Sequence, residues 1–390
     1  MTPTTRRGRS EAGGPVRALR RLLTRWLARP IVRGSPRRYR AAIVKVDRLG
    51  DFVLAVSAIR HVVAFHGEEQ CLLVVSPSAE AMAAREFPRT PRLVLPIEPG
   101  HKRLLWEGGN ARTLLAGVSA DEVICLRHQR GDWEELILGW LGGRRTCVLD
   151  EPRAGQESAA RRTWVHAGPG RVQFDQVMAP VDGGCRELER HRQLLMHALD
   201  RPLTATELMP RFERVGAGAA RGGIVVTPFG SAAIRDFPEE LLVAALRAVR
   251  KHSAAPIALQ GDSAQQPRLR RLAESLQSAG VTGVTCAAPA GVTDFASAVA
   301  GAELVVTVET ATAHLAAAFD RPAVILIGGG HFGEFGPWAR SARQVWLTHR
   351  IDCFDCNWRC VHPEPYCLTR IAAEPVCAAV AKALQEGASA

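Results

Sequence analysis

The sequence predicts an α/β protein built from two Rossmann-like domains, each a parallel sheet with helices on both faces. Two observations predict this class. Short apolar runs typical of strands alternate with amphipathic helical stretches, and this alternation stops at a Gly/Ala/Arg-rich break and then resumes. A chain of 390 residues also suits about two domains. Ligands of open parallel sheets bind at the carboxyl ends of the strands, so the expected site is a central cleft between the domains.

The first domain is expected to cover residues 41–215. It begins with an apolar strand at Ala42–Val46 and a helix at Phe52–His66, whose apolar residues cluster on one side. Further strands are predicted at Leu72–Ser76, Leu93–Ile97, Val123–Leu126 and Thr146–Leu149. Residues 151–180 are weakly patterned and predict a long loop, which a helix at Glu187–Leu199 follows.

The second domain is expected to cover residues 222–375, after a linker at Gly216–Gly223. The same alternation returns, and residues 376–390 predict a C-terminal helix. The predicted strands are Ile224–Thr227, Ile257–Gln260, Val281–Cys286, Leu304–Val308 and Ala323–Ile327. The predicted helices are Pro238–Val249, Pro267–Ser278, Asp294–Ala300 and Ala311–Phe319.

The positive charge of the chain is concentrated in its N-terminal tail, residues 1–40. This tail holds twelve arginines and a single acid, Glu11, whereas the other 350 residues carry 38 basic and 38 acidic side chains. A nucleic-acid surface needs positive charge clustered on the folded body. We therefore expect no nucleic-acid partner.

Residues 15–29 of the tail predict an amphipathic helix. Its apolar stripe consists of Val16, Leu19, Leu22, Leu23, Trp26 and Leu27, and its other side is rich in arginine. This pattern is typical of a helix that lies on an anionic membrane surface. Two alternatives stay open: a helix packed on the protein's own surface, and a mitochondrial-type presequence.

The location expected from the sequence is cytoplasmic, with the tail as a route to peripheral attachment on the inner face of the cytoplasmic membrane. No stretch of 18 or more uncharged apolar residues is present, so no membrane-spanning helix is expected. The Arg-rich N-terminus also lacks the uninterrupted apolar core of a secretory signal.

The first candidate motif, Asp47–Asp51, directly follows the first predicted strand. Gly50 permits a tight turn, and Asp51 stands at the start of the next helix. A helix N-terminus stabilises a carboxylate, so Asp51 is expected to stay ionised, which suits a general base. The alternative is an Asp that only caps its helix.

The second candidate motif, Thr227–Pro238, follows the first strand of the second domain. Its Gly/Ser-containing turn, with Ser231, leads toward a helix and offers backbone N–H groups to an anion. Arg235 adds a positive charge that can hold a phosphate through two hydrogen bonds. The alternative is a surface arginine beside a helix cap.

The third candidate motif, Val308–Ala318, follows a strand and opens a helix. Glu309, Thr310 and the amides at Ala311 and the next residue would form an anion-receptive rim. His314 lies four residues after Thr310 and shares its helical face, which favours a phosphate or sugar contact over a purely structural role. A Gly-rich loop at Ile327–Gly333 follows the next strand and would add Gly329 and His331 to the same pocket.

These motifs resemble those of glycosyltransferase family 9, the ADP-heptose:lipopolysaccharide heptosyltransferase family. The segment Ile43–Arg60 is similar to the opening segment of that family. Arg235 stands where the family has a Lys before an aromatic-Pro pair, and Glu309-Thr310-Ala311 stands where it reads Asp-Thr-Gly. The longer carboxylate and the added methyl group change the surroundings of the donor sugar.

The resemblance implies a GT-B fold, with an acceptor-side first domain and a donor-binding second domain. It implies transfer with inversion from a nucleotide-diphosphate sugar, ADP-heptose, to a lipid-linked glycan of the lipopolysaccharide core, without a catalytic metal. Asp51 would take the proton of the acceptor hydroxyl, and Arg235 would contact the diphosphate. Two alternatives are a transferase for another nucleotide sugar and a non-catalytic, membrane-docked binding protein with the same fold.

Four of the ten cysteines form a cluster within a Cys-rich insertion at residues 351–368. The cluster consists of Cys353, Cys356, Cys360 and Cys367. Four thiolates can close a tetrahedral zinc or iron site, and without a secretory signal such a cluster favours a metal over disulfides. The expected role is structural, because four protein ligands leave no open position. The alternative is four ordinary cysteines in a loop.

Overall fold

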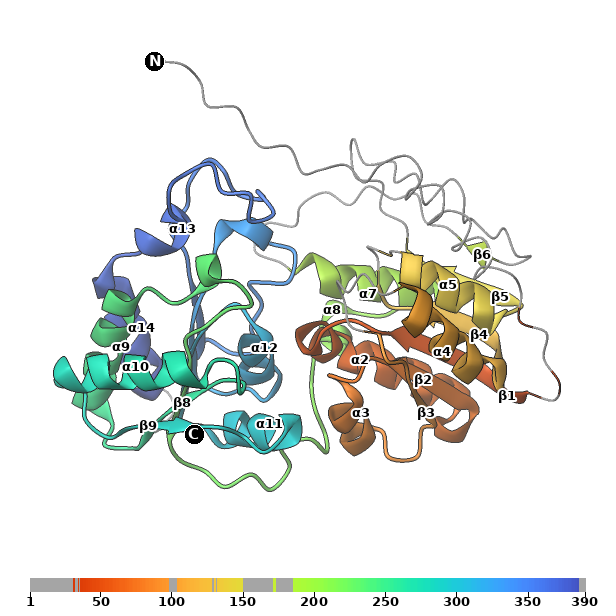
Figure 1. The fold of residues 1–390 in the computed structure, drawn as a ribbon, viewed down its shortest axis with the longest axis horizontal. Helices are drawn as coiled ribbons and strands as arrows, with labels where there is room; N and C mark the ends of the chain where they lie inside the picture. The colour runs from red at the N-terminus through yellow and green to blue at the C-terminus, as the bar shows by residue number, and fades with distance from the viewer. Residues whose placement is uncertain are drawn as a thin grey trace, which may run out of the picture.

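The computed structural model describes residues 31, 34, 36–97, 104–127, 130, 132–149, 171–172 and 185–385. The predicted tail helix at 15–29 and most of the predicted loop at 151–180 lie outside these residues. Within the described part, two six-stranded parallel sheets follow one another along the chain, as the sequence predicts. Figure 1 shows them side by side, with the first sheet on the right and the second on the left.

The first sheet has the strand order β3-β2-β1-β4-β5-β6. Its strands are β1 (Arg37–Lys45), β2 (Cys71–Val75), β3 (Arg92–Val94), β4 (Val118–Cys125), β5 (Arg145–Val148) and β6 (Arg171–Val172). Its helices are α2 (Leu49–His66), α3 (Glu80–Glu86), α4 (Leu104–Ala116), α5 (Asp132–Leu141), α7 (Arg186–Ala198) and α8 (Ala205–Leu208). The order reverses direction between β1 and β4, which is where ligands of such sheets bind.

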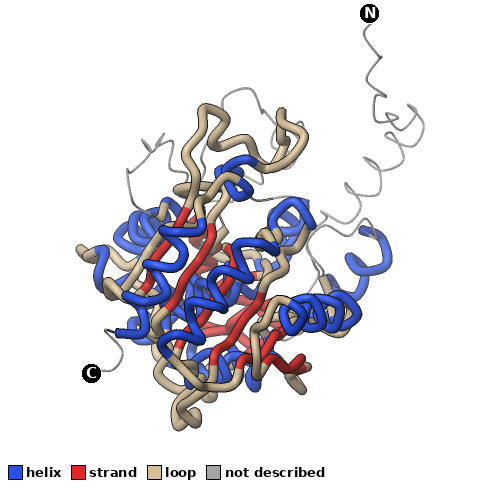
Figure 2. The backbone as a smooth tube through the Cα atoms, turned by 90° about the vertical axis from the view of Figure 1, so that its left-hand side faces the viewer, coloured by secondary structure: helices blue, strands red, loops and turns tan. Residues whose placement is uncertain are grey.

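The second sheet has the strand order β12-β11-β10-β7-β8-β9, with its own reversal between β10 and β7. Its strands are β7 (Ile224–Thr227), β8 (Ile257–Gln260), β9 (Val284–Ala287), β10 (Leu304–Val308), β11 (Ala323–Leu326) and β12 (Gln344–Leu347). Its helices are α9 (Glu239–His252), α10 (Gln266–Ser278), α11 (Val292–Gly301), α12 (Ala311–Ala318), α13 (Tyr366–Thr369) and α14 (Ala373–Gln385). Figure 2 shows strands lying between helices on both sides.

Several elements differ from the sequence prediction. β1 begins at Arg37 instead of Ala42, because its polar first residues pair with β4 from Arg37↔Val118 onward. β6 is a two-residue strand inside the predicted loop, and β12, α8 and α13 are additional short elements. Each of these segments has only two or four residues, which is too short to show a helical or strand period.

One apolar core runs through both halves of the chain. It joins residues of α2, α3 and α7 to residues of α11 and α12, and it includes alternate residues of β1 and β11. Two further cores cover the opposite faces, one beneath α4 and α5 and the other beneath α9, α10 and α14. Strands with both faces covered read as continuous apolar runs, which is why their sequences show little alternation.

α2 also passes the length and composition test for a membrane-spanning helix, within the part of the chain that the structure describes. Ten of its residues are buried against the sheet and its neighbouring helices. Because a core helix of this kind passes the same test, we assign α2 to the interior of the domain.

The segment that leads into the linker is anchored by Glu86 at the end of α3. Its carboxylate accepts hydrogen bonds from the backbone amides of Glu213, Arg214 and Val215, at 2.8, 3.0 and 3.1 Å. Arg60 of α2 pairs with the same carboxylate. The residues just before the linker are therefore fixed to the first domain before the chain crosses to β7.

Candidate functional site

The candidate site lies where the carboxyl-terminal edges of the two sheets meet. The N-termini of α2 and α12 abut there: a Cβ added to Gly50 would lie 3.4 Å from the His314 ring and 3.5 Å from the Ala311 Cα. The two helices thus approach so closely at position 50 that a single methyl group would be in van der Waals contact with α12. This contact brings Asp51, in the first turn of α2, to the same junction as the Glu309–His314 motif.

Asp51 is partly exposed at this junction. Among the described residues, its carboxylate makes no hydrogen bond or ion pair. Burial raises the pKa of Asp51 to about 6; the charge of Asp47 acts in the same direction, and the charge of Lys45 opposes it. The N-terminus of α2, which would lower the pKa of Asp51, therefore does not determine it, because desolvation of the carboxylate has the larger effect. Asp51 is still mostly ionised at pH 7 and above, as a general base must be.

Arg235 is fixed at the start of α12 by Glu309. Its guanidinium donates to the Glu309 carbonyl at 2.6 Å, to the Glu309 carboxylate at 3.1 Å and to the Ser231 hydroxyl at 3.1 Å. Glu309 stands where the resembled family has Asp, and its carboxylate reaches Arg235. The arginine thus holds a positive charge beside the N-terminal amides of α12, and both features attract an anion.

Glu309 is buried, and its protonation is finely balanced. Burial raises the pKa of Glu309 to about 7, Arg235 opposes this rise, and the negative charge of Asp51 adds to it. The carboxylates of Asp51 and Glu309 therefore act on each other across the two sheets.

Thr310 and Ala311 form the rim of the second sheet's switch point. Thr310 is the N-cap of α12, and its hydroxyl donates to the Val308 carbonyl at 3.2 Å and caps no helix amide. Thr227 of β7 and Thr307 of β10 join through their hydroxyls at 2.6 Å directly beneath. The first amides of α12 consequently have no side-chain cap, which leaves them available to an anion.

His314 is uncharged and packed between tryptophans. Its Nδ1 accepts from the Trp338 indole at 3.1 Å, and its ring stacks on Trp338 and lies beside Trp346. Burial lowers the pKa of His314 to about 3, and Arg235 lowers it further. A neutral, buried ring supplies no positive charge to a phosphate.

His331, on the Gly-rich loop, is held by the Cys-rich insertion. Its Nε2 lies 2.7 Å from the Asn357 side-chain oxygen, and its Nδ1 accepts from the Trp358 indole at 3.3 Å. Burial lowers the pKa of His331, although the bond to Asn357 opposes this. Both ring nitrogens are therefore engaged by side chains of the insertion.

Trp358 covers the Gly-rich loop and reaches Arg235. A Cβ on Gly328 or Gly330 would overlap the Trp358 ring, and one on Gly329 would lie 2.7 Å from the Phe354 ring. The Arg235 guanidinium carbon lies 5.2 Å from the centre of a Trp358 ring. Glycine is required in this loop because the aromatic rings of the insertion lie directly on its backbone.

The Cys-rich insertion bends sharply around its thiols. Asp355, Asn357 and Trp358 all have left-handed backbones, with φ of 63°, 49° and 57°. For a residue as bulky as Trp358 this is a strained conformation, which persists only where the surroundings fix it. The strain accompanies the placement of the indole between the Gly-rich loop and Arg235.

The four predicted cysteines share one neighbourhood without closing into a ligand set. The charges of Cys356 and Cys360 act on Cys353, and those of the other three act on Cys367; in both cases burial is the main cause of the raised pKa. Within the described ranges, no group of three or more His, Cys, Asp or Glu side chains is positioned to hold a metal ion.

A buried group of charges that the sequence did not reveal lies under Asp51. Lys45 at the end of β1 is fully buried; its Nζ lies 3.0 Å from Asp47, 3.4 Å from Glu187 and 3.0 Å from the Leu126 carbonyl. Burial alone would lower the pKa of Lys45, but Asp47 and Glu187 outweigh it and raise it. A lysine at the end of an apolar strand is the signal that could have pointed to this group.

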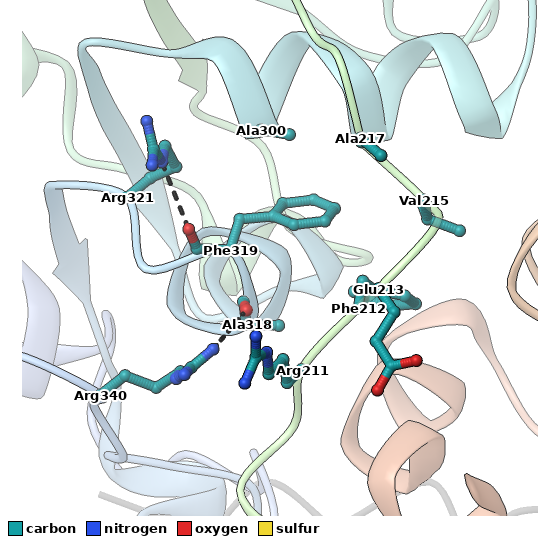
Figure 3. A pocket seen from close by; sticks show the side chains of 11 residues that line it. Arg211, Phe212, Glu213, Val215, Ala217, Ala300, Ala318, Phe319, Arg321 and Arg340 are labelled. Carbon is teal, nitrogen blue, oxygen red and sulfur yellow. Dashed lines mark hydrogen bonds between the residues drawn. The ribbon is translucent and has the colours of Figure 1, made fainter.

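A separate pocket of about 380 Å³ lies beside the interdomain linker, at the other end of α12 (Figure 3). Arg321 and Arg340 line it, and they donate to the Phe319 and Ala318 carbonyls at the helix C-terminus. Positive charge at that end stabilises the helix, so capping explains these arginines. We therefore place the candidate site at the helix N-termini and not in this pocket.

Comparison with known proteins places the chain among sugar transferases. The model of "Glycosyltransferase family 9 (heptosyltransferase)" matches residues 147–361. Lipopolysaccharide heptosyltransferase 1 of Pseudomonas aeruginosa is 30% identical over 220 residues, which span 56% of this chain and 57% of that relative.

Several solved structures share the fold. A family 9 glycosyl transferase from Veillonella parvula has a TM-score of 0.66 at 14% identity, covering 91% of this chain and 99% of its own. The iron-containing heptosyltransferase TibC of enterotoxigenic E. coli, solved with ADP-D-β-D-heptose, has a TM-score of 0.50 at 10% identity, covering 91% of this chain and 78% of its own. The prediction of two facing parallel-sheet domains of GT-B type is confirmed.

Proposed function

Because this chain belongs to glycosyltransferase family 9, a family of glycosyltransferase enzymes, we propose that it transfers heptose from ADP-heptose to a lipopolysaccharide-core or related glycan, with inversion at the transferred carbon. The observation that carries this proposal is the meeting of Asp51 with the Arg235–Glu309 pair at the abutting N-termini of α2 and α12. In this proposal Asp51 is the general base, and it faces an anion-binding rim across the junction.

The proposed reaction follows from this geometry. Asp51 takes the proton of the acceptor hydroxyl as its oxygen attacks the anomeric carbon of the donor sugar. The bond from that carbon to the diphosphate breaks, and negative charge develops on the leaving diphosphate. Arg235 and the amides of Thr310, Ala311 and Thr312 would stabilise that charge. The residues need no bound metal for this step.

A different nucleotide sugar is the second candidate donor. It is favoured by the Arg235–Glu309 ion pair and by the methyl group of Ala311, which together alter the rim where the sugar would approach. Turnover of a panel of nucleotide sugars by the full chain, ADP-heptose included, decides between them. If none of the panel is consumed in the presence of a glycan acceptor, the transferase proposal fails.

We further propose that the four insertion cysteines hold a structural zinc or iron ion. The donor set suits such an ion, three of the thiols stand on a tightly turned loop, and the similar TibC is an iron-containing protein. The structure leaves the thiols short of a ligand set, so binding would draw them together. The expected result is about one zinc or iron per chain in purified protein by mass spectrometry, lost in Cys356→Ser.

The metal prediction has a matched control in Cys286→Ser, a cysteine of β9 outside the insertion. This variant should keep the metal. Substoichiometric zinc and iron in the wild-type chain would show that the four cysteines are ordinary loop residues.

For the Arg-rich tail we propose attachment of the enzyme to an anionic membrane surface through residues 15–29, on the cytoplasmic side. The support is the sequence alone: an apolar stripe opposite arginines. Deleting residues 1–38 is expected to reduce binding to vesicles containing anionic lipid, as measured by co-sedimentation, and to leave transfer to a soluble acceptor unchanged. Equal vesicle binding with and without the tail would remove this proposal.

A further inference from the structure

An unbroken series of ion pairs connects the donor-side Gly-rich loop to the buried lysine beneath Asp51. Glu334 follows the Gly-rich loop, and its carboxylate accepts from Arg190 of α7 at 2.6 and 3.4 Å. Arg190 lies 3.7 Å from Glu187, and Glu187 lies 3.4 Å from Lys45. We call Glu334–Arg190–Glu187–Lys45 the ion-pair chain.

The ion-pair chain crosses from one domain to the other. Lys45, Glu187 and Arg190 belong to the first sheet and its helix α7, whereas Glu334 belongs to the second domain. The backbone reinforces this crossing: the Arg186 amide donates to the Gly333 carbonyl at 2.9 Å, and the Glu187 amide donates to the Glu334 carbonyl at 3.0 Å. The Gly-rich loop is thus fastened to the N-terminus of α7.

Each end of the ion-pair chain lies next to a part of the proposed site. At the donor end, the Glu334 amide donates to the carbonyl of His331, inside the Gly-rich loop, at 3.0 Å. At the base end, Lys45 pairs with Asp47, four residues before Asp51. None of the four residues of the ion-pair chain is more than 6% exposed, so water screens their charges little.

We propose that Lys45 and Arg190 are positioning residues. Through the ion-pair chain they hold the Asp51 carboxylate at a fixed position relative to the donor site. The ion-pair chain is complete only when the two domains are in contact. This inference rests on the proposed role of Asp51. Losing one partner of a buried ion pair leaves an uncompensated charge, so a gap anywhere in the series disturbs its neighbours. The position of the Gly-rich loop and the protonation of Asp51 are then coupled.

The protonation of Asp51 gives a direct readout of this link. The charged groups that act on Asp51 are Asp47 and Lys45 at the end of β1, Glu187 on α7 and Arg127 after β4, and Glu309 faces it from α12. Lys45 lowers the pKa of Asp51, and Glu187 raises it. Changes at the two ends of the ion-pair chain should therefore move this pKa in opposite directions.

The test is a carboxyl NMR titration of Asp51 in the full chain, together with kcat. Lys45→Met removes a positive charge and is expected to raise the pKa of Asp51 above about 6, by roughly one unit. Glu334→Gln, in the other domain, removes the carboxylate that binds Arg190, so Arg190 offsets more of the negative charge of Glu187. This change is expected to lower the pKa of Asp51. Each change should reduce kcat at least about fivefold. The reduction of kcat in the double variant should be smaller than the product of the two single reductions.

The matched control is Arg192→Gln, which breaks an ion pair with Glu189 on the same helix without reaching the second domain. It should leave both the titration and kcat unchanged. If Lys45→Met does not fold, Glu187→Gln replaces it, with a fall in the Asp51 pKa as the expected result.

The proposal is overturned if Glu334→Gln gives the Asp51 titration of the Arg192→Gln control, or if the two single effects multiply fully. These outcomes are separable from failure of the proposed function. A wild-type chain that turns over no nucleotide sugar refutes the transferase proposal, whereas the NMR titration needs no turnover.

Discussion

Asp51→Asn is expected to lower kcat by about 10²- to 10⁴-fold while leaving ADP binding within about twofold of wild type. The range is the usual contribution of a positioned general base. Asparagine keeps the shape of the side chain but cannot take a proton. Among the described residues Asp51 makes no ion pair that its loss would break, so the fold should persist.

The pH dependence of the wild-type enzyme adds a second readout. The raised pKa of Asp51, about 6, means that the carboxylate is protonated as the pH falls below 6 and cannot then act as a base. The expected kcat/KM profile therefore declines on its acid side with an apparent pKa near 6, and this limb should be missing from the residual activity of Asp51→Asn.

The matched control for this variant is Asp262→Asn, which changes a carboxylate that follows β8 and bonds to the Gln265 amide. Its kcat should stay close to that of the wild type. An Asp51→Asn variant that retained more than about a tenth of the wild-type kcat would rule out Asp51 as the base.

Arg235→Met is expected to weaken ADP binding by about 10- to 100-fold, the usual cost of losing hydrogen bonds to a charged group. The guanidinium stands beside the N-terminal amides of α12, where a diphosphate would gain from both. Calorimetric titration with ADP measures the effect. Arg235→Lys keeps the charge but loses the bidentate geometry of the guanidinium, so it should recover only part of the affinity for ADP.

Loss of Arg235 also changes Glu309. Arg235 holds down the pKa of Glu309, which burial has already raised to about 7. Without the arginine, Glu309 should be neutral at pH 7.5, visible as a further rise in its titration midpoint. The control is Arg247→Met on α9, whose side chain bonds only to the Ala279 carbonyl in the described structure. ADP affinity equal to that of this control would refute a donor role for Arg235.

Much of the fold could be predicted from the sequence because buried strands leave a continuous apolar record. The predicted bounds of β7, β8 and β10 match the structure residue for residue, since each is a short apolar run between polar turns. The start of β1 could not be predicted in this way, because Arg37 and Arg38 belong to the strand through backbone pairing alone.

The candidate site could be predicted where it follows a strand end and not where it depends on distant partners. Glu309 directly follows β10, Asp51 stands six residues after β1 and Arg235 stands eight residues after β7. Parallel strands bring their carboxyl ends to one edge of a sheet, so the three residues could be expected near one another. The contact of Lys45 with Glu187 joins residues 142 positions apart, and no local pattern encodes it. The contact of Trp358 with Arg235 also joins residues far apart in the sequence, and no local pattern encodes it either.

The apolar core that runs through both domains limits how the enzyme can open to admit its substrates. Two domains with separate cores can swing about a hinge, but here α2 and α12 bury their flanks in one shared interior. A wide swing would expose that interior to water. Gly50 presents no side chain to α12, which permits the two helices to slide along each other, so we expect substrate entry through a shear motion of small amplitude.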